Sequence, residues 1–383
     1  MSAPLEGIVV ADFSRVLAGP LATMTLADLG ARVIKVERPG TGDDTRAWGP
    51  PYADSGMTTY FESANRGKES VALDLTDPGD RDRAHELIAR SDVVIENFRP
   101  GLFAALGFDW ERLSEDHPGL VYASVSGFGL GEGAALPGYD FVAQAVGGLM
   151  HITGEAGGDA MKAGVALVDV LTGKDAVIGI LAALRRRERT GRGSKIEVNL
   201  LSSLQAALVN QVSAHLGAGV EPGRLGNRHP SIAPYESLQC ADAPIAVACG
   251  NDAQFARMTQ ELGRPELAAD PRFARNPDRV RHRAALVQEL ESALAEGPAG
   301  VWAERLNRVG VAAGVVNTIG EGIALAERLG LEPVQEARGA DGRRSRQIRS
   351  PLRWTPEIPV RPAAPPRLGE HDPAIRAWLD AAR

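Results

Sequence analysis

The sequence contains few cysteines, few aromatic residues and no long apolar run. Its only cysteines, Cys240 and Cys249, match neither the ligand spacing of a zinc site nor a CxxC redox pair. We therefore expect reduced thiols and a cytoplasmic location. The longest uncharged apolar run, Ala176–Leu184, is far too short to span a bilayer. The first residues also lack the basic start and apolar core of a secretory signal, so the sequence predicts no contact with a membrane.

The chain also lacks an excess of positive charge. The chain has 42 Lys and Arg against 49 Asp and Glu, a net charge of −7, which leaves no basic excess for nucleic acid. The GxxxxGK[ST], GxSxG and HExxH motifs are absent, and the seven histidines lack metal-ligand spacing, so we expect no metal site. Gly129, Gly131 and Ala134 fit GxGxxA, but Pro137 follows where a dinucleotide-binding helix would begin.

The first half of the chain alternates short apolar strands with helices. This order predicts a parallel sheet with right-handed crossovers, and 383 residues favour two domains. A Gly- and Pro-rich stretch after Gly217 predicts a linker to a smaller α+β unit, and the Pro-rich segment from about Pro351 predicts an extended tail. The expected strands are 7–12, 32–37, 70–75, 92–97, 120–126 and 195–199, and the expected helices in this half are 21–29, 80–90 and 200 to about 215.

One later segment predicts a long helix with an acid at its start. Residues 168–187 are apolar nearly all round, which predicts a buried helix, and arginines gather at its C-terminal end, where the helix dipole favours cations. Asp169 falls in the first turn. Taken alone, an acid in this position is explained by capping or by the helix dipole.

An ordered series of motifs resembles the class III coenzyme A transferases, a family that includes formyl-CoA transferases, carnitine CoA-transferases and 2-methylacyl-CoA racemases. The motifs cover essentially the whole chain and read ADFSRVLAGPLATMTLADLGARVIKVERPG, YFESANRGKESVALDL, DVVIENFRPG, PGYDFVAQAVGGLMHITGE, AGVALVDVLTGKDAVIGILAALRRRERTGRG, GVAAGVVNTIGE and PPRLGEH. The resemblance implies an α/β fold: a large Rossmann-like parallel-sheet domain, a smaller α+β domain and an interlocked homodimer. The implied division is 1–218 for the large CoA-binding domain, 219–329 for the small domain, and 330–383 for a segment returning to the large domain.

The resemblance also implies a chemical role for Asp169. Its position matches the family aspartate that attacks an acyl-CoA thioester, giving an aspartyl-acyl anhydride, an aspartyl-CoA thioester and then a second anhydride with the acceptor acid. Coenzyme A and its esters would be substrates, with no permanently bound cofactor. We expect the helix N-terminus to favour the ionised carboxylate.

Further positions match the CoA-binding groove of the family. Arg38 matches a residue that meets the CoA phosphates, and Arg99 would replace the cation that is missing at Ala105. The ordinary structural roles of these residues, a solvated arginine or a core side chain, remain open. The other expected groove residues are Val16, Leu73, Leu75, Asn97, Phe98, Leu106 and Tyr139.

The expected acyl pocket departs from that of formyl-CoA transferases. Leu17 replaces a glutamine and Pro137 a lysine, which disfavours formate and oxalate as substrates. Tyr139 is retained, and its hydroxyl either steadies the covalent intermediate or belongs to a packed surface tyrosine. Trp48 matches a residue that borders the pocket, and Gly250 is the one glycine left of a glycine-rich lid.

Two alternatives stay open at this point. Racemases of the family use the histidine of a GHD motif, whereas this chain has Gly138–Tyr139–Asp140, and a tyrosine is a poor base at neutral pH. A protein that binds CoA without catalysis is the second alternative. The stretch NLLSSLQAALVNQVSAHLGAG resembles enzymes that move CoA between dicarboxylic acids, so we expect a dicarboxylic or branched acceptor, but the sequence does not identify the donor or the acceptor.

Overall fold

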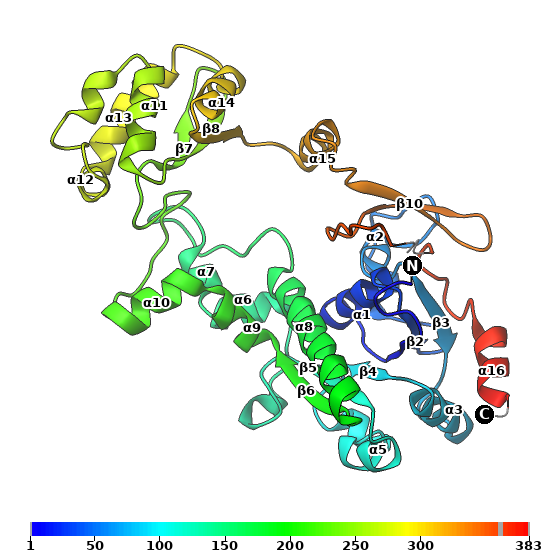
Figure 1. The fold of residues 1–383 in the computed structure, drawn as a ribbon. Helices are drawn as coiled ribbons and strands as arrows, with labels where there is room; N and C mark the ends of the chain where they lie inside the picture. Colours follow the sequence, from blue (N-terminus) through cyan, green and yellow to red (C-terminus); the bar gives the residue numbers. More distant parts are fainter. Residues whose placement is uncertain (1, 359–362, 382–383) are drawn as a thin grey trace. The chain divides into compact units, whose positions relative to one another are not determined.

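The computed structural model describes residues 2–358 and 363–381, and its chain divides into two compact units (Figure 1). Part of the predicted Pro-rich tail, residues 359–362, lies outside the described residues. The predicted division placed residues 150–161 in the large domain, whereas in the structure they group with the smaller unit. The large unit comprises Met1–Leu149, Lys162–Val220 and Glu332–Arg383, and the smaller unit comprises Met150–Met161 and Glu221–Leu331.

The large unit is built on the predicted parallel sheet. Its strand order is β3-β2-β1-β4-β5-β6, and every neighbouring pair is parallel. The order reverses between β1 and β4, and open α/β sheets bind ligands outside the carboxyl ends of the strands at such a point. The strands are β1 (Val9–Asp12), β2 (Arg32–Glu37), β3 (Lys68–Ala72), β4 (Val93–Glu96), β5 (Val121–Ser126) and β6 (Ser194–Asn199).

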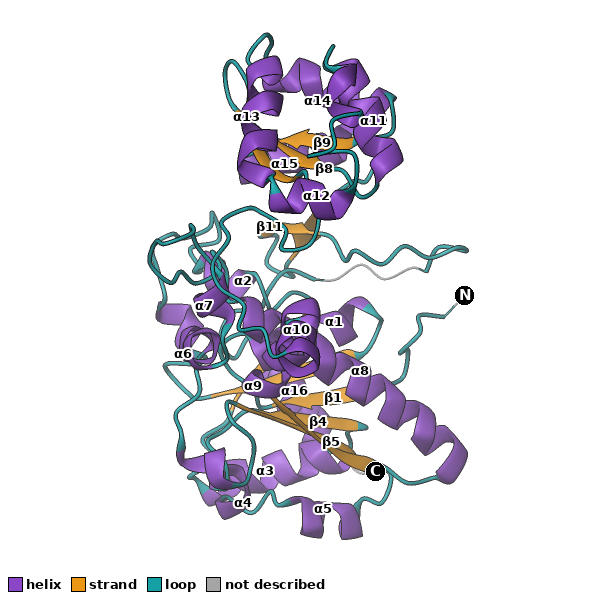
Figure 2. Cartoon of the chain, turned by 90° about the vertical axis from the view of Figure 1, so that its left-hand side faces the viewer, coloured by secondary structure: helices purple, strands orange, loops and turns teal. Residues whose placement is uncertain are grey.

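Helices cover both faces of this sheet (Figure 2). Alternate strand residues point to opposite faces, so Val10 packs with α1 (Ala18–Asp28) and α8 (Leu167–Thr190), and Ala11 packs with α3 (Pro78–Ala89). The other helices of the large unit are η1 (Asp44–Ala47), α2 (Thr59–Glu62), α4 (Leu102–Ala105), α5 (Trp110–Asp116), η2 (Glu132–Ala135), α6 (Asp140–Val146), α9 (Leu200–Ala207), α10 (Val209–Ala218) and α16 (Asp372–Asp380). Helix α7 (Leu149–Ile152) spans the division between the units.

Two expectations about helices were wrong. The segment after residue 200 is two helices, α9 and α10, separated at Leu208, and Val209 has a φ of +37°. Helix α8 is buried on one side only: its inner face packs on α1 and the sheet, while Ile178 is 65% exposed. An apolar composition therefore did not make this helix buried all round within one chain.

The C-terminal region contains a hairpin that the sequence analysis did not predict and, within the predicted extended tail, a helix. A hairpin of β10 (Val334–Arg338) and β11 (Arg344–Ile348) is held to α2, because Gln347 Nε2 donates to the Glu62 carbonyl at 2.9 Å. The chain then ends in α16, whose Ile375 and Leu379 are buried in the core beside α3.

The smaller unit is α+β, as predicted. Its antiparallel sheet has the order β7-β8-β9, and a separate apolar core includes Phe255, Leu290 and Trp302. Its elements are β7 (Tyr235–Gln239), β8 (Pro244–Ala248), α11 (Asp252–Glu261), η3 (Pro265–Ala268), α12 (Asn276–Arg281), α13 (Arg283–Leu294), α14 (Ala299–Arg308), β9 (Ala312–Val315) and α15 (Ile319–Arg328). Within the described residues of both units, no helix combines the length and apolar character needed to cross a membrane.

Candidate active site

A cavity of about 380 Å³ lies where the sheet order reverses. Its walls come from the loop after β1, the loop after β4, the end of β5, the segment before α6 and the start of α8. The structure therefore brings together seven side chains that the sequence singled out. They are Val16, Leu17, Asn97, Phe98, Arg99, Tyr139 and Asp169.

Asp169 is held in this cavity by a cap from another helix. The N-cap residue of α8 has no side-chain cap of its own. Instead, Asp140 Oδ1 accepts hydrogen bonds from the backbone N–H of Val168 at 2.7 Å and of Asp169 at 3.1 Å. Gln144 Nε2 donates to the other Asp140 oxygen at 2.6 Å. Asp140 thus satisfies helix N–H groups that would otherwise lack a partner.

The electrostatics of Asp169 differ from the expectation. Burial, and after it the negative charge of Asp140, raises the pKa of Asp169 from its ordinary 3.8 to about 7. We expected the helix N-terminus to favour the ionised form, and that expectation was wrong. Two N–H groups of the first turn point to Asp140, so Asp140 takes the hydrogen bonds that would have stabilised an Asp169 anion.

A close helix contact sets the position of α8. A Cβ atom on Gly173 would lie 2.7 Å from the carbonyl oxygen of Ala18, a separation that real Cβ atoms do not adopt. Only glycine lets α8 approach the start of α1 this closely. Because Ala18 also lines the cavity, this contact brings the first turn of α8 to the loop after β1.

Of the three aromatic residues considered for this site, Tyr139 lines the cavity, whereas Tyr60 and Trp48 do not. Burial, and after it the charge of Asp169, raises the pKa of half-buried Tyr60, so this hydroxyl belongs to the electrostatic surroundings of Asp169. Trp48 does not line the cavity, and its ring packs edge-on against Tyr60 with 5.2 Å between ring centroids. Tyr139 lines the cavity and is 60% exposed. The sequence singled out Trp48 and Tyr139 but not Tyr60.

Arg15 is a second functional candidate that sequence reasoning missed. It lines the main cavity, where its guanidinium lies over the Phe98 ring, 5.5 Å from the centroid. Its Nη1 pairs with Asp44 at 3.3 Å, while its buried Nε has no hydrogen-bond partner within the described residues. Its place in the cavity wall makes the Arg15 guanidinium a candidate partner for an anionic or carbonyl oxygen.

A smaller cavity of about 150 Å³ adjoins the first, because Arg15 and Phe98 line both. It contains three predicted groove residues, Arg38, Leu73 and Leu75. The side chain of Arg38 is 54% exposed and pairs with Asp44 at 2.5 Å. All the predicted CoA-binding residues except Leu106 are thus distributed over two neighbouring cavities.

Besides Trp48, two predicted residues line neither cavity. Leu106 lines neither cavity and packs against the apolar core beneath the sheet, with Phe103 and Phe108 among its members. Gly250 belongs to the smaller unit, where its N–H donates to Gln254 Oε1 at 2.8 Å.

Comparison with known proteins gives a consistent family. The family model described as CoA-transferase family III matches residues 5–372. The chain is 40% identical to succinate–glutarate CoA-transferase of Agrobacterium fabrum, over 98% of this chain and 96% of that protein. It is 43% identical to acetyl-CoA:oxalate CoA-transferase of Acetobacter aceti, over 85% of this chain and 83% of that protein. A crystal structure of a CAIB/BAIF family protein from Brucella suis superposes with a TM-score of 0.88 and 41% identity, covering 99% of this chain and 100% of that one.

Proposed function

Because the chain belongs to CoA-transferase family III, we propose that it transfers coenzyme A from an acyl-CoA to a dicarboxylic acid, with Asp169 as the nucleophile. The observation that carries this proposal is the carboxylate of Asp169 in a cavity at the sheet's switch point, with its pKa raised to about 7. Near neutral pH a substantial part of it is ionised, and a more basic carboxylate is a better nucleophile than an ordinary one.

The proposed reaction has four acyl-transfer steps and needs no oxidant or reductant. An Asp169 oxygen attacks the acyl carbon of the donor thioester, the C–S bond breaks and the CoA thiolate leaves. The thiolate attacks the Asp169 carbonyl carbon, so the donor acid leaves with one Asp169 oxygen and an aspartyl-CoA thioester remains. An acceptor carboxylate then displaces the thiolate to form a second anhydride. Finally the thiolate attacks the acceptor acyl carbon and Asp169 is released as a carboxylate.

Residues around Asp169 have separate proposed roles. Asp140 is a positioning residue, because its two hydrogen bonds fix the first turn of α8. The anhydride is sensitive to water, and the burial that raises the pKa of Asp169 also limits hydrolysis. The hydroxyl of Tyr139, which lines the cavity, is the donor that we propose for the carbonyl oxygens of the intermediates.

The two adjoining cavities support a path for the CoA ester. The apolar side chains of Leu73 and Leu75 and the guanidinium of Arg38 line the smaller cavity, which suits an adenine ring and its phosphates. Arg15 and Phe98, common to both cavities, would contact the pantetheine arm between them. We therefore propose that the nucleotide end occupies the smaller cavity and the thioester the larger one.

A dicarboxylic acceptor is supported by the cations of the larger cavity. Arg15 and Arg99 line it together with Asp169, so one carboxylate can react at Asp169 while the other pairs with a guanidinium. The named relatives act on succinate, glutarate and oxalate. The expectation against oxalate rests on Leu17 and Pro137 alone, so oxalate belongs among the acceptors to be tested.

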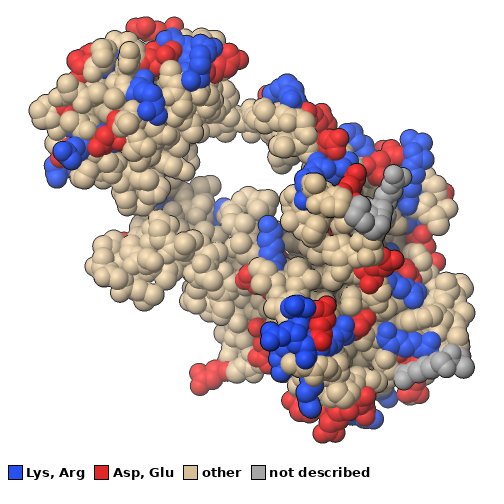
Figure 3. Space-filling view, in the orientation of Figure 1, with Lys and Arg blue, Asp and Glu red and all other residues tan. Residues whose placement is uncertain are grey.

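The proposal includes a homodimer. Apolar side chains on and just after α10 are strongly exposed: Val209 at 68%, Leu216 at 78% and Val220 at 53%. Figure 3 shows almost no charged side chains over α10. Several exposed apolar side chains in a region with few charges are typical of an interface. Sedimentation of the wild type and of Leu216→Glu tests this assignment, which predicts a dimer that the variant weakens and is contradicted by a wild-type monomer.

The activity itself is tested with a panel of acids. Succinyl-CoA is offered with glutarate, mesaconate, oxalate or formate, and the new CoA ester is measured by mass spectrometry. We expect turnover with dicarboxylates, and we expect Asp169→Asn to lower it by orders of magnitude while CoA still binds. Normal turnover by Asp169→Asn contradicts the mechanism. Deuterium from solvent at the α-carbon of a 2-methylacyl-CoA, without acyl exchange, favours the racemase, and CoA binding without either reaction favours a passive binding protein.

A further inference from the structure

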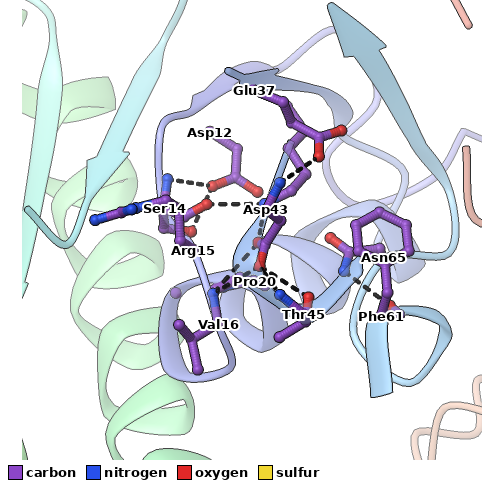
Figure 4. A network of polar contacts seen from close by, with 12 residues as sticks. Asp12, Ser14, Arg15, Val16, Pro20, Glu37, Asp43, Thr45, Phe61 and Asn65 are labelled. Carbon is purple, nitrogen blue, oxygen red and sulfur yellow. Dashed lines mark hydrogen bonds and ion pairs between the residues drawn. The ribbon is translucent and has the colours of Figure 1, made fainter. Parts of the chain in front are cut away.

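Side chains form hydrogen bonds with most of the backbone polar groups of residues 14–16, in the loop between β1 and α1 (Figure 4). The Ser14 N–H donates to Asp12 Oδ1 at 2.9 Å, and the Ser14 carbonyl accepts from Lys35 Nζ at 2.8 Å. The Asn97 side chain binds both backbone polar groups of Arg15: its Oδ1 accepts from the Arg15 N–H at 2.8 Å, and its Nδ2 donates to the Arg15 carbonyl at 2.7 Å.

The third residue of this loop is bound as well. The Val16 N–H donates to both oxygens of Asp43 at 3.3 Å. Of the six backbone N–H and C=O groups in these three residues, five are therefore bound by side chains. We call the four residues that provide these contacts, Asp12, Lys35, Asp43 and Asn97, the anchor residues.

Val16 has a backbone conformation that explains why such anchoring is needed. Its φ is +70°, in the left-handed region, where a β-branched residue is a clear outlier. Such strain persists only where the surrounding structure over-determines it. Val16 also lines the cavity that contains Asp169, so the strained residue lies in the candidate site.

Three of the four anchor residues, Asp12, Lys35 and Asp43, are charged, buried and in ion pairs. Lys35 Nζ lies 2.9 Å from Asp43, and Asp12 lies 3.0 Å from Lys68 Nζ, with all four side chains at 0% exposure. Burial alone would raise the pKa of Asp43, but Lys35 and hydrogen bonds from Thr45 lower it to about 2, so Asp43 is a carboxylate at neutral pH. Buried ion pairs add little net stability over apolar packing, which points to another reason for these charges.

We propose that Asp43 and Lys35 are positioning residues that hold Val16 in its strained conformation, so that Arg15, Val16 and Leu17 form a preshaped wall for the CoA ester. The inference rests on the proposed function, since it assigns this cavity to the ester. A wall that is already fixed in the free protein does not have to be ordered when the ligand binds. The strain is then a cost of folding and not of binding.

Glycine at position 16 separates this role from simple stability. Glycine adopts a φ of +70° without strain, so Val16→Gly needs little anchoring. We expect Asp43→Asn to weaken CoA binding by calorimetry, and to raise the KM for the acyl-CoA, by about tenfold, with a smaller change in kcat. Val16→Gly removes a side chain from the cavity wall, so it sets its own reference KM; added to Val16→Gly, Asp43→Asn should raise the KM by no more than about threefold.

Asp28→Asn is the matched control. Asp28 forms another buried ion pair of the large unit, 2.6 Å from Arg66, and it binds none of the loop residues. It should lower the stability without changing the KM, and Val16→Gly should not alter its effect. If Asp43→Asn weakens CoA binding equally with and without the Val16→Gly substitution, or if Asp28→Asn raises the KM as much as Asp43→Asn does, the proposal is overturned.

Two further results separate the possible failures. If Asp43→Asn does not fold while the double variant folds and binds CoA as Val16→Gly does, relief of strain is supported. A double variant that also does not fold, or does not bind, contradicts it. A wild type that does not bind CoA at all refutes the proposed function first, whereas a wild type that binds CoA and shows no rescue refutes only the role of Asp43.

Discussion

Replacing Asp169 with asparagine should stabilise the protein at alkaline pH while it removes the nucleophile. The pKa of Asp169 rises from 3.8 to about 7 on folding, so its neutral form is favoured in the folded state. The stability that this group contributes is fully present below pH 3.8 and is lost as the pH rises through 7. Asparagine resembles the neutral acid and avoids this loss. With about 1.4 kcal/mol for each pKa unit, the gain of the variant reaches about 4 kcal/mol above pH 7.

Urea unfolding of both proteins, followed by tryptophan fluorescence at about pH 5 and about pH 8, measures this difference. The free-energy advantage of Asp169→Asn should grow by roughly 2 to 3 kcal/mol between the two pH values. Asp80→Asn is the control, since Asp80 also lies in the first turn of a helix. Burial would raise the pKa of Asp80, but the Asp74 N–H and Arg376 lower it below 3.8, so its stabilising effect is already complete at pH 5 and the stability lost in Asp80→Asn should be the same at both pH values. An advantage of Asp169→Asn that does not change with pH refutes the assigned burial and charge repulsion.

Three other changes test neighbouring parts of the account. Asp140→Asn keeps an oxygen for the helix N–H groups but removes the charge that raises the pKa of Asp169, so the ascending limb of kcat/KM against pH should move to lower pH; an unmoved limb contradicts the coupling. Arg38→Ala should raise the KM for CoA esters more than it lowers kcat, by up to about 1.5 kcal/mol for an exposed charge-assisted contact, and an unchanged KM makes Arg38 a solvated residue. Gly173→Ala forces a Cβ against the Ala18 carbonyl, and should cost about 1 to 3 kcal/mol in urea unfolding and lower kcat; normal values of both show that α8 can shift freely.

The parallel sheet was predictable because its signal is local. Several strand runs, such as 7–12 and 70–75, are followed by a helical pattern, and this alternation leaves few topologies. The helix that carries Asp169 was predicted within three residues at either end. The C-terminal helix was missed although Pro373 at its start is a helix-initiation signal, because the preceding prolines suggested an extended chain.

The details of the site were less accessible to sequence reasoning. Asp140 and Asp169 are 29 residues apart, and only the packing of α6 beside α8 makes one the cap of the other's helix. No local pattern indicates a positive φ at a valine such as Val16. Similarly, a motif match does not say which way a side chain points: Leu106 matched the groove, but it packs against the core and lines neither cavity.

The central claim is that Asp169 exchanges oxygen with the acids between which CoA moves. Wild-type enzyme is incubated with succinyl-CoA and glutarate whose carboxyl groups carry ¹⁸O, and the peptide containing Asp169 is isolated and weighed by mass spectrometry. In the proposed sequence the bridging oxygen of the second anhydride comes from the acceptor and stays on Asp169 when the thiolate attacks the acceptor carbon. The account predicts ¹⁸O in Asp169, and later in released succinate. Turnover that leaves Asp169 and succinate unlabelled contradicts it.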